Sequence, residues 1–179
     1  MRCTQRENVQ EHSLQVAIIA HALGLIKNKY FEGQVSPEKI ALAAIFHDAT
    51  EVLTGDLPTP VKYFNPEIRK AYQAIEKNAA EQLTKLLPED FKADYRKLLF
   101  DADDKETKTL VKAADTLAAY IKCQEEEAAG NTEFSRARKT IEAKLNELRK
   151  THPEVDYFAQ HFVPSFSLTL DDLSGPLEG

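Results

Sequence analysis

Apolar residues recur every three or four positions along most of this sequence, and that spacing limits the possible fold more than any other feature. In the first such stretch, one helical face carries His12, Val16, Ile19, Leu23 and Ile26. The strict alternation typical of strands is nearly absent, and residues 166–170 are its one hint. The pattern predicts a single all-α domain over residues 1–179.

Capping residues and prolines mark where these helices begin and end. Asn8 and Glu11 form a capping-box pattern ahead of the first helix. Ser36-Pro37 opens a second helix, which we expect to continue to about Thr54 and to stop at Gly55. Further helices are expected from Asn65, over residues 104–129 and over residues 133–150, with a short amphipathic piece near residue 95 and an irregular tail over residues 164–179.

Charge and cysteine content exclude several classes of partner. The net charge of −6 disfavours tight binding to a nucleic acid polymer, because such binding needs Lys and Arg to replace counterions on the phosphates. Only two cysteines are present, far apart, which indicates a reducing environment. No apolar run approaches the roughly 20 residues that span a bilayer. We therefore expect a cytoplasmic protein that binds neither nucleic acid polymer nor membrane.

Four ionisable side chains interrupt the apolar faces of three predicted helices. His12 lies on the first, the adjacent His47 and Asp48 lie on the second, and Asp115 lies on the long helix. Buried charges need partners, so these groups either pair with one another or bind a cation. Two imidazoles and two carboxylates suit a divalent transition metal. Glu51 follows Asp48 by three positions, which on a helix would place it beside the metal as a general acid or base.

The second predicted helix is followed by a loop stiffened by proline. The segment Asp56-Leu57-Pro58-Thr59-Pro60 cannot be helix interior, because its two prolines would break the helical hydrogen bonds. We therefore expect a rigid loop that leaves the end of the helix carrying His47 and Asp48.

The order of one His, then His-Asp, then a distant Asp resembles the HD-domain superfamily of metal-dependent phosphohydrolases. The closer resemblance is to the bacterial HD-domain 5′-deoxynucleotidases, an all-α helical-bundle family. It rests on residues 7–16, 47–63 and 111–115, and on Tyr-Phe and Phe-Val-Pro-Ser-Phe near the end of the chain.

The resemblance implies the hydrolysis of deoxyribonucleoside 5′-monophosphates to deoxynucleoside and phosphate by a homodimer. It further implies that one divalent metal ion, such as Co, Mn or another transition metal, is held by His12, His47, Asp48 and Asp115. By the same resemblance, Glu51 acts in proton transfer. The sugar is contacted by Asp56, Leu57, Pro58 and Thr59.

Two features of the sequence refine this expectation. No histidine lies between His47 and His152, whereas binuclear HD phosphodiesterases use extra histidines in that interval. A mononuclear site is therefore favoured. Members of the family also carry an N-terminal segment with an Arg and a Trp beside the substrate. That segment is not found ahead of His12, and the sequence contains no tryptophan.

Three other interpretations remain open at the level of the sequence. The protein could be an HD hydrolase of another nucleotide, such as a nucleoside triphosphate or an alarmone. It could be a non-catalytic nucleotide-binding HD module. It could also be a structural helical domain in which His12, His47, Asp48 and Asp115 only pair with one another.

Overall fold

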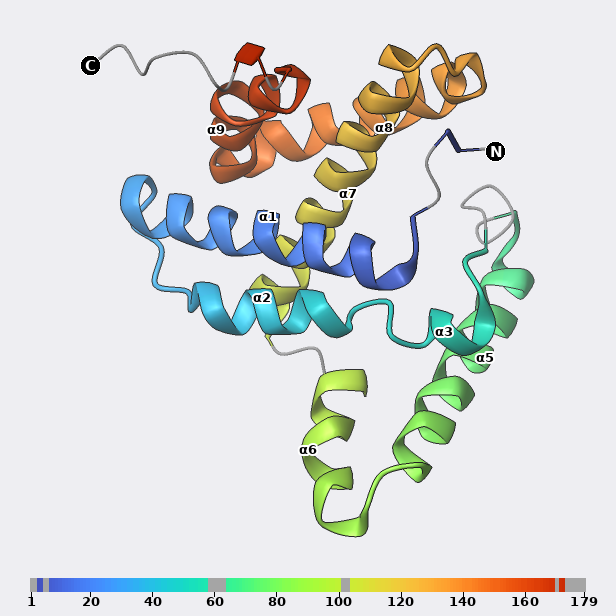
Figure 1. The fold of residues 1–179 in the computed structure, drawn as a ribbon. Coiled ribbons are helices and arrows are strands. Elements are labelled where there is room, and N and C mark those ends of the chain that lie inside the picture. The colour runs from blue at the N-terminus through green and yellow to red at the C-terminus, as the bar shows by residue number, and fades with distance from the viewer. Residues whose placement is uncertain (1–2, 5–6, 58–63, 101–103, 170, 173–179) are drawn as a thin grey trace.

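The protein is all-α, and its helices appear in Figure 1. The computed structural model describes residues 3–4, 7–57, 64–100, 104–169 and 171–172. The α-helices are α1 (Val9–Tyr30), α2 (Pro37–Phe46), α3 (Glu51–Thr54), α5 (Pro66–Lys85), α6 (Glu89–Phe100), α7 (Lys105–Ala128), α8 (Ser135–Thr151) and α9 (Pro153–His161). Two 3-10 helices, η1 (Thr132–Phe134) and η2 (Val163–Ser167), complete the described elements.

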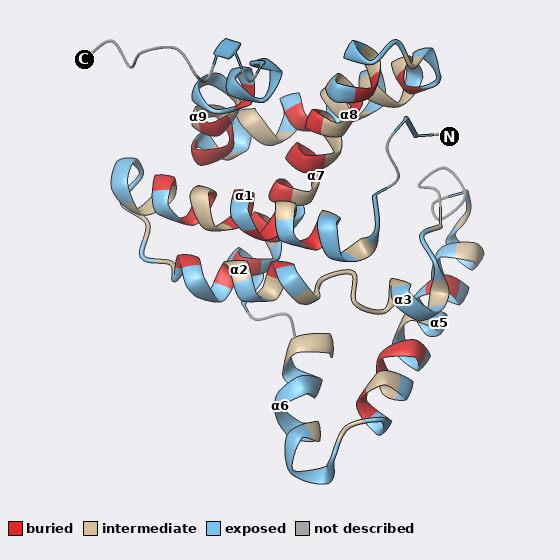
Figure 2. Ribbon diagram, viewed as in Figure 1, coloured by how far each residue is buried: buried red, intermediate tan, exposed pale blue. Residues whose placement is uncertain are grey.

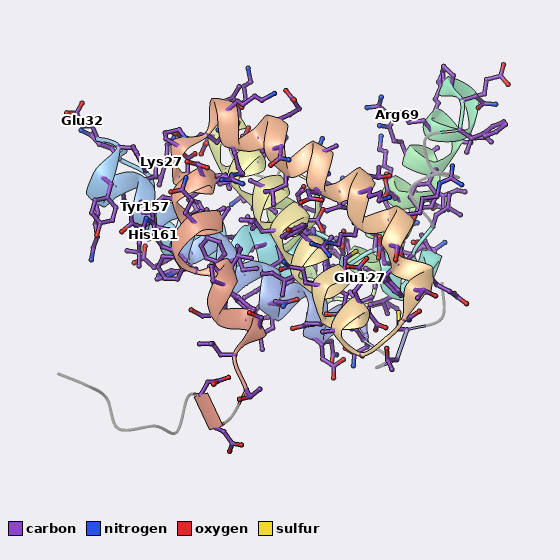
Figure 3. All side chains as sticks on the ribbon, turned by 90° about the horizontal axis from the view of Figure 1, so that it is seen from above. Lys27, Glu32, Arg69, Glu127, Tyr157 and His161 are labelled. Atoms are coloured by element: carbon purple, nitrogen blue, oxygen red, sulfur yellow. The ribbon has the colours of Figure 1, made fainter. Side chains whose placement is uncertain are left out.

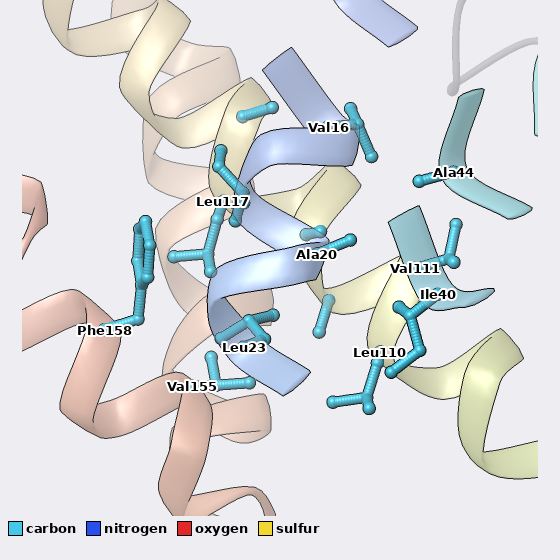
Figure 4. Packing of buried hydrophobic residues seen from close by; sticks show 14 of the residues in the cluster. Val16, Ala20, Leu23, Ile40, Ala44, Leu110, Val111, Leu117, Val155 and Phe158 are labelled. Atoms are coloured by element: carbon cyan, nitrogen blue, oxygen red, sulfur yellow. The ribbon is translucent and has the colours of Figure 1, made fainter. Parts of the chain in front are cut away.

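Helix α1 lies at the centre of the molecule and packs against α2, α7 and α9. Its buried side chains meet those of the neighbouring helices in one apolar cluster, part of which is drawn in Figure 4. The cluster includes Val16, Leu23, Ile40, Leu117, Val155 and Phe158. Because each such side chain contributes about 1.5–3 kcal/mol when fully buried, the cluster holds α1 firmly against α7.

Helices α5 and α6 form a hairpin that projects away from this core (Figure 1). Figure 2 shows that α6 presents intermediate or exposed residues along its whole length. The hairpin contacts the rest of the protein through α3, which packs on α5, and through α2, which packs on α6. It is therefore attached to the core at the segments that follow and precede His47 and Asp48.

The predicted continuation of the second helix to Thr54 is wrong. Helix α2 ends at Phe46, and residues 47–50 form a turn before α3 begins. In this turn Ala49 N donates to Phe46 O at 3.1 Å and Glu51 N donates to Asp48 O at 2.9 Å. These bonds span three residues instead of four, which tightens the backbone and ends the helix.

The turn changes the directions in which the side chains of His47 and Asp48 point. Adjacent residues of a continuous helix do not face the same way. In the turn both side chains reach one partner: the Asp48 carboxylate lies 3.6 Å from His12 Nε2, and the rings of His47 and His12 lie 5.5 Å apart between centroids. The prediction that the pair lies on a helical face is therefore corrected to a position just after the helix.

The last helix was not predicted from the sequence. Helix α9 begins at Pro153 and buries Glu154, Val155 and Phe158 against the core. Figure 3 shows Lys27, Tyr157 and His161 grouped where the end of α1 meets α9. The expected irregular tail begins with η2, and residues 166–169 contain no strand.

Within the described ranges, no helix combines the length and apolar character that crossing a membrane requires.

Candidate metal centre

The start of α1 places His12 in its first turn. The Asn8 side chain accepts hydrogen bonds from Gln10 N and Glu11 N, and the Glu11 side chain accepts from Asn8 N. This capping box satisfies backbone donors that would otherwise lack partners at the helix start. His12 N donates to Asn8 O at 3.1 Å, so the backbone of His12 is held within the ordered first turn.

The structure brings together the four residues that the sequence singles out. His12 Nε2 lies 3.3 Å from Asp115 Oδ1 and 3.6 Å from Asp48 Oδ2. His47 Nε2 lies 3.0 Å from Asp48 Oδ2. One ligand atom from each of His12, His47 and Asp115 lies within 4.8 Å of the others. Three separate segments thus direct nitrogen and oxygen donors to one small volume.

The ring of His47 is oriented by the backbone of α2. Its Nδ1 lies 2.7 Å from Ala44 O, and a carbonyl oxygen can only accept a hydrogen bond. Nδ1 therefore carries the hydrogen, and Nε2 of the neutral ring presents a lone pair. That Nε2 atom is buried and, despite its proximity to Asp48, has no hydrogen-bond partner of good geometry. A buried nitrogen with a free lone pair, fixed by a carbonyl behind it, fits a metal ligand.

The electrostatics of the cluster support the same conclusion. The hydrogen bond to Asp115 raises the pKa of His12, and the carboxylate charges add to this shift against the effect of burial. Burial alone would raise the pKa of Asp115, but His12, His47 and the Lys144 ammonium together lower it. The carboxylates therefore favour positive charge at this position. Imidazole nitrogens and carboxylate oxygens are a donor set that transition metals accept.

The expected proton-transfer and sugar-contact residues follow directly in the chain. Glu51 opens α3 and is half-buried, and its backbone nitrogen is bonded to Asp48 O as described above. Asp56 is exposed and Leu57 is half-buried, just beyond Gly55 at the end of α3. Pro58 and Thr59 lie outside the described residues.

Two contacts, one at His47 and one at Gly55, were missed by the sequence analysis. The Ala44 carbonyl that orients His47 leaves no trace in the sequence, because every residue carries one. Tyr72 of α5 was given no role from the sequence, and its hydroxyl donates to Gly55 O at 3.2 Å. Helical spacing could reveal that Tyr72 is buried, but not what its hydroxyl meets.

The other histidines lie outside this cluster. His152 Nδ1 lies 3.5 Å from Glu154 Oε1, and the His161 ring lies 4.3 Å from the Tyr157 ring. His21, on α1, is half-buried. His152 and His161 thus have neighbours of their own, away from the cluster.

Comparison with known proteins agrees with this arrangement. The sequence model of the 5′-deoxynucleotidase YfbR-like family matches residues 1–166. A 5′-deoxynucleotidase of Vibrio parahaemolyticus is 55% identical over 175 residues, covering 97% of this chain and 89% of the relative. The 5′-deoxynucleotidase YfbR of Escherichia coli is also 55% identical, covering 97% of this chain and 87% of the relative.

A solved structure shares the fold. An HD-domain phosphohydrolase from Listeria innocua superposes with a TM-score of 0.80 at 25% sequence identity. The match covers 96% of this chain and 82% of that protein. The helical arrangement around the His-Asp cluster is therefore that of an HD-domain phosphohydrolase.

Proposed function

Because the chain belongs to the YfbR-like 5′-deoxynucleotidase family, it is a hydrolase of deoxyribonucleoside 5′-monophosphates, and we propose that the His-Asp cluster is where this reaction takes place. The observation that carries the proposal is the approach of His12, His47 and Asp115 ligand atoms to within 4.8 Å of one another. Asp48 adds a carboxylate oxygen to the same volume.

In this proposal one divalent cation is held by His12, His47, Asp48 and Asp115. Bound there, the cation supplies Lewis-acid stabilisation of the charge that develops on the phosphate. The two carboxylates offset the charge of the cation. The Ala44 carbonyl keeps the His47 ring aligned, so little reorganisation accompanies binding. The donor set does not select among Mn, Co and other transition metals.

In this proposal Glu51 acts in proton transfer and Asp56 binds the sugar. Hydrolysis forms a bond from the oxygen of water to phosphorus and breaks the bond from phosphorus to the 5′-oxygen. The water loses a proton and the 5′-oxygen gains one, giving deoxynucleoside and orthophosphate. Glu51 moves a proton at one of these two oxygens. The Asp56 carboxylate accepts a hydrogen bond from the 3′-hydroxyl of the sugar.

Phosphate release from deoxynucleotides in the presence of Mn²⁺ or Co²⁺ tests this proposal. We expect orthophosphate and deoxynucleoside as products, with release abolished by a chelator and by Asp48→Asn. Wild-type activity no greater than that of Asp48→Asn would overturn the assignment of the site. Release of pyrophosphate or tripolyphosphate would instead indicate a hydrolase of another nucleotide.

We propose in addition that the protein forms a homodimer. The outward face of α1 exposes two large apolar side chains one turn apart, Leu14 at 59% and Ile18 at 63%. The neighbouring α2 exposes Leu42 and Ile45. Exposed apolar groups on adjacent helices are typical of protein interfaces where they form a continuous patch. Light scattering in solution should give twice the chain mass of 20.2 kDa, and a monomer mass would contradict the proposal.

The two cysteines support a cytoplasmic location as part of this proposal. Cys3 is exposed, Cys123 is buried, and both are free thiols. Free thiols persist in reducing compartments. Fractionation of cells that express the protein should recover it in the cytoplasmic fraction, and recovery outside that fraction would contradict this location.

A further inference from the structure

The carbonyl of Gly55 is tied to a helix of the projecting hairpin. Tyr72 of α5 donates its hydroxyl hydrogen to Gly55 O at 3.2 Å, and the Thr54 hydroxyl donates to the same oxygen at 3.0 Å. The Thr54 bond is local, between neighbouring residues. The Tyr72 bond joins residues 17 positions apart and so relates α5 to the end of α3.

Gly55 is the point at which the chain leaves α3 for the segment that carries Asp56. Its backbone has φ 68° and ψ 162°, a combination that is essentially restricted to glycine. Its nitrogen donates to Glu51 O at 2.8 Å. The direction in which Asp56 leaves the helix therefore depends on how the Gly55 peptide is held on both of its sides.

Burial holds the Tyr72 side chain in place, so that it can fix the position of the Gly55 peptide. Tyr72 is 6% exposed, whereas most of the α5 surface around it is open to solvent. Helix α3, which ends just before Gly55, also packs on α5. Because the Tyr72 ring is buried and its hydroxyl is bonded to the Gly55 carbonyl, the position of α5 fixes the position of the peptide at the start of that loop.

We infer that Tyr72 is a positioning residue for substrate binding, which holds the Gly55 peptide so that Asp56 meets the sugar of the deoxynucleotide. The inference rests on the sugar contact proposed for Asp56. Tyr72 does not touch the metal ligands in this scheme. Its contribution therefore belongs to recognition of the sugar and not to the phosphate side of the site.

The test is Tyr72→Phe, which removes the hydroxyl and keeps the ring. Loss of one hydrogen bond should raise KM for dAMP about three- to tenfold, with a smaller change in kcat. KM for AMP should change in the same direction, because AMP carries the same 3′-hydroxyl as dAMP. The inhibition constant of inorganic phosphate and the Kd for Mn²⁺ should stay at their wild-type values.

The matched control is Tyr95→Phe on the same hairpin. Tyr95 lies at the contact with α2, where its ring meets Phe46 edge-on at 6.0 Å between centroids. This variant should keep the wild-type KM for dAMP. In an Asp56→Asn background, Tyr72→Phe should cause no further rise in KM, because its effect passes through Asp56.

Hydrogen exchange separates this inference from the proposed function. Amides at residues 55–57 should exchange faster in Tyr72→Phe than in the wild type or in Tyr95→Phe, whether or not the enzyme turns over dAMP. Unchanged exchange would overturn the anchoring role. Equal losses for dAMP and inorganic phosphate would show a general structural effect and overturn the sugar-specific one. A wild type that releases no phosphate from dAMP would instead count against the proposed function.

Discussion

His12 Nε2 lies 3.3 Å from Asp115 Oδ1, and this contact joins the first turn of α1 to the middle of α7. The two helices also share the apolar core, so the distance between their polar groups is set by the packing of side chains such as Val16 and Leu117. A cation between these groups would find its donors already assembled. This arrangement is a form of preorganisation, because the core holds an imidazole and a carboxylate close together before any ligand arrives.

Asp115→Asn should weaken metal binding strongly. The change keeps the size of the side chain but removes one of two negative charges from the cluster. Changes in groups that only orient metal ligands cost about 10–100-fold in affinity, so loss of a charged ligand should cost at least the upper part of that range. Calorimetric titration with Mn²⁺ measures this directly.

A suitable control for this variant is Asp94→Asn. Asp94 lies on exposed α6, where its carboxylate contacts Lys97 at 3.4 Å. Its replacement should leave Mn²⁺ binding unchanged. Equal metal affinity for Asp115→Asn and the wild type would show that Asp115 is not a ligand. No measurable Mn²⁺ binding by the wild type would support the third interpretation of the sequence, a structural ion-pair network.

Glu154→Gln should destabilise the fold. Glu154 is 0% exposed, and its Oε1 lies 3.3 Å from Lys27 Nζ, linking α9 to α1. Removing the charge leaves the partly buried Lys27 with a weaker partner, which should cost about 1–3 kcal/mol in the free energy of unfolding. Urea denaturation monitored by circular dichroism gives this value.

The comparison for Glu154 is Glu147→Gln on α8. Glu147 also pairs with a lysine, Lys150, at 2.6 Å, but both side chains are exposed. Exposed pairs of this kind contribute about 0–1 kcal/mol, so the control should unfold at nearly the wild-type midpoint. Similar midpoints for the two variants would show that the buried Glu154 pair contributes no more to the free energy of unfolding than the exposed Glu147 pair.

Gly55→Ala should affect both stability and substrate binding. A Cβ at this position meets nothing within 4 Å, so the penalty comes from the backbone conformation alone, at φ 68°. Holding alanine there should cost about 1–3 kcal/mol. Relief of the strain would shift the Gly55 peptide and raise KM for dAMP. Thermal unfolding and steady-state kinetics measure the two effects.

Gly130→Ala provides a control that also places alanine at a positive φ. Gly130 has φ 83° beyond the end of α7, and a Cβ there also meets nothing within 4 Å. It should lose stability by a similar amount while keeping KM for dAMP. If KM rose equally in both variants, the effect at Gly55 would be a consequence of lost stability and not of loop position.

The two cysteines should differ in reactivity. Burial raises the pKa of the Cys123 thiol, and the nearby Glu127 carboxylate adds to the shift. Since the thiolate is the reactive form, Cys123 should react slowly at pH 8, whereas the exposed Cys3 should react readily. Mass spectrometry after treatment with iodoacetamide should show modification at Cys3 alone, and at both residues in concentrated urea. Rapid modification of Cys123 in the native protein would contradict the packing of α7.

Much of the secondary structure follows from local interactions and could be read from the sequence. The capping box of Asn8 with Glu11 and the prolines at the starts of α2 and α5 act within a few residues, so their effect does not depend on the rest of the chain. Helical spacing likewise predicts the all-α fold, which the structure confirms. Resemblance over residues 47–63 correctly predicted the 5′-deoxynucleotidase family.

Tertiary structure decided where α2 stops and which groups meet. No proline or glycine lies between Phe46 and Thr54, so these common turn signals do not predict the turn that carries His47 and Asp48. The approach of His12 to Asp115 and the bond from Tyr72 to Gly55 join segments that only packing brings together. Propensity and capping act over a single helical turn, whereas the direction of a side chain toward a distant partner depends on every contact that orients its helix. The sequence by itself therefore determined the kinds of residue available for a metal centre, and the packed core decided their geometry.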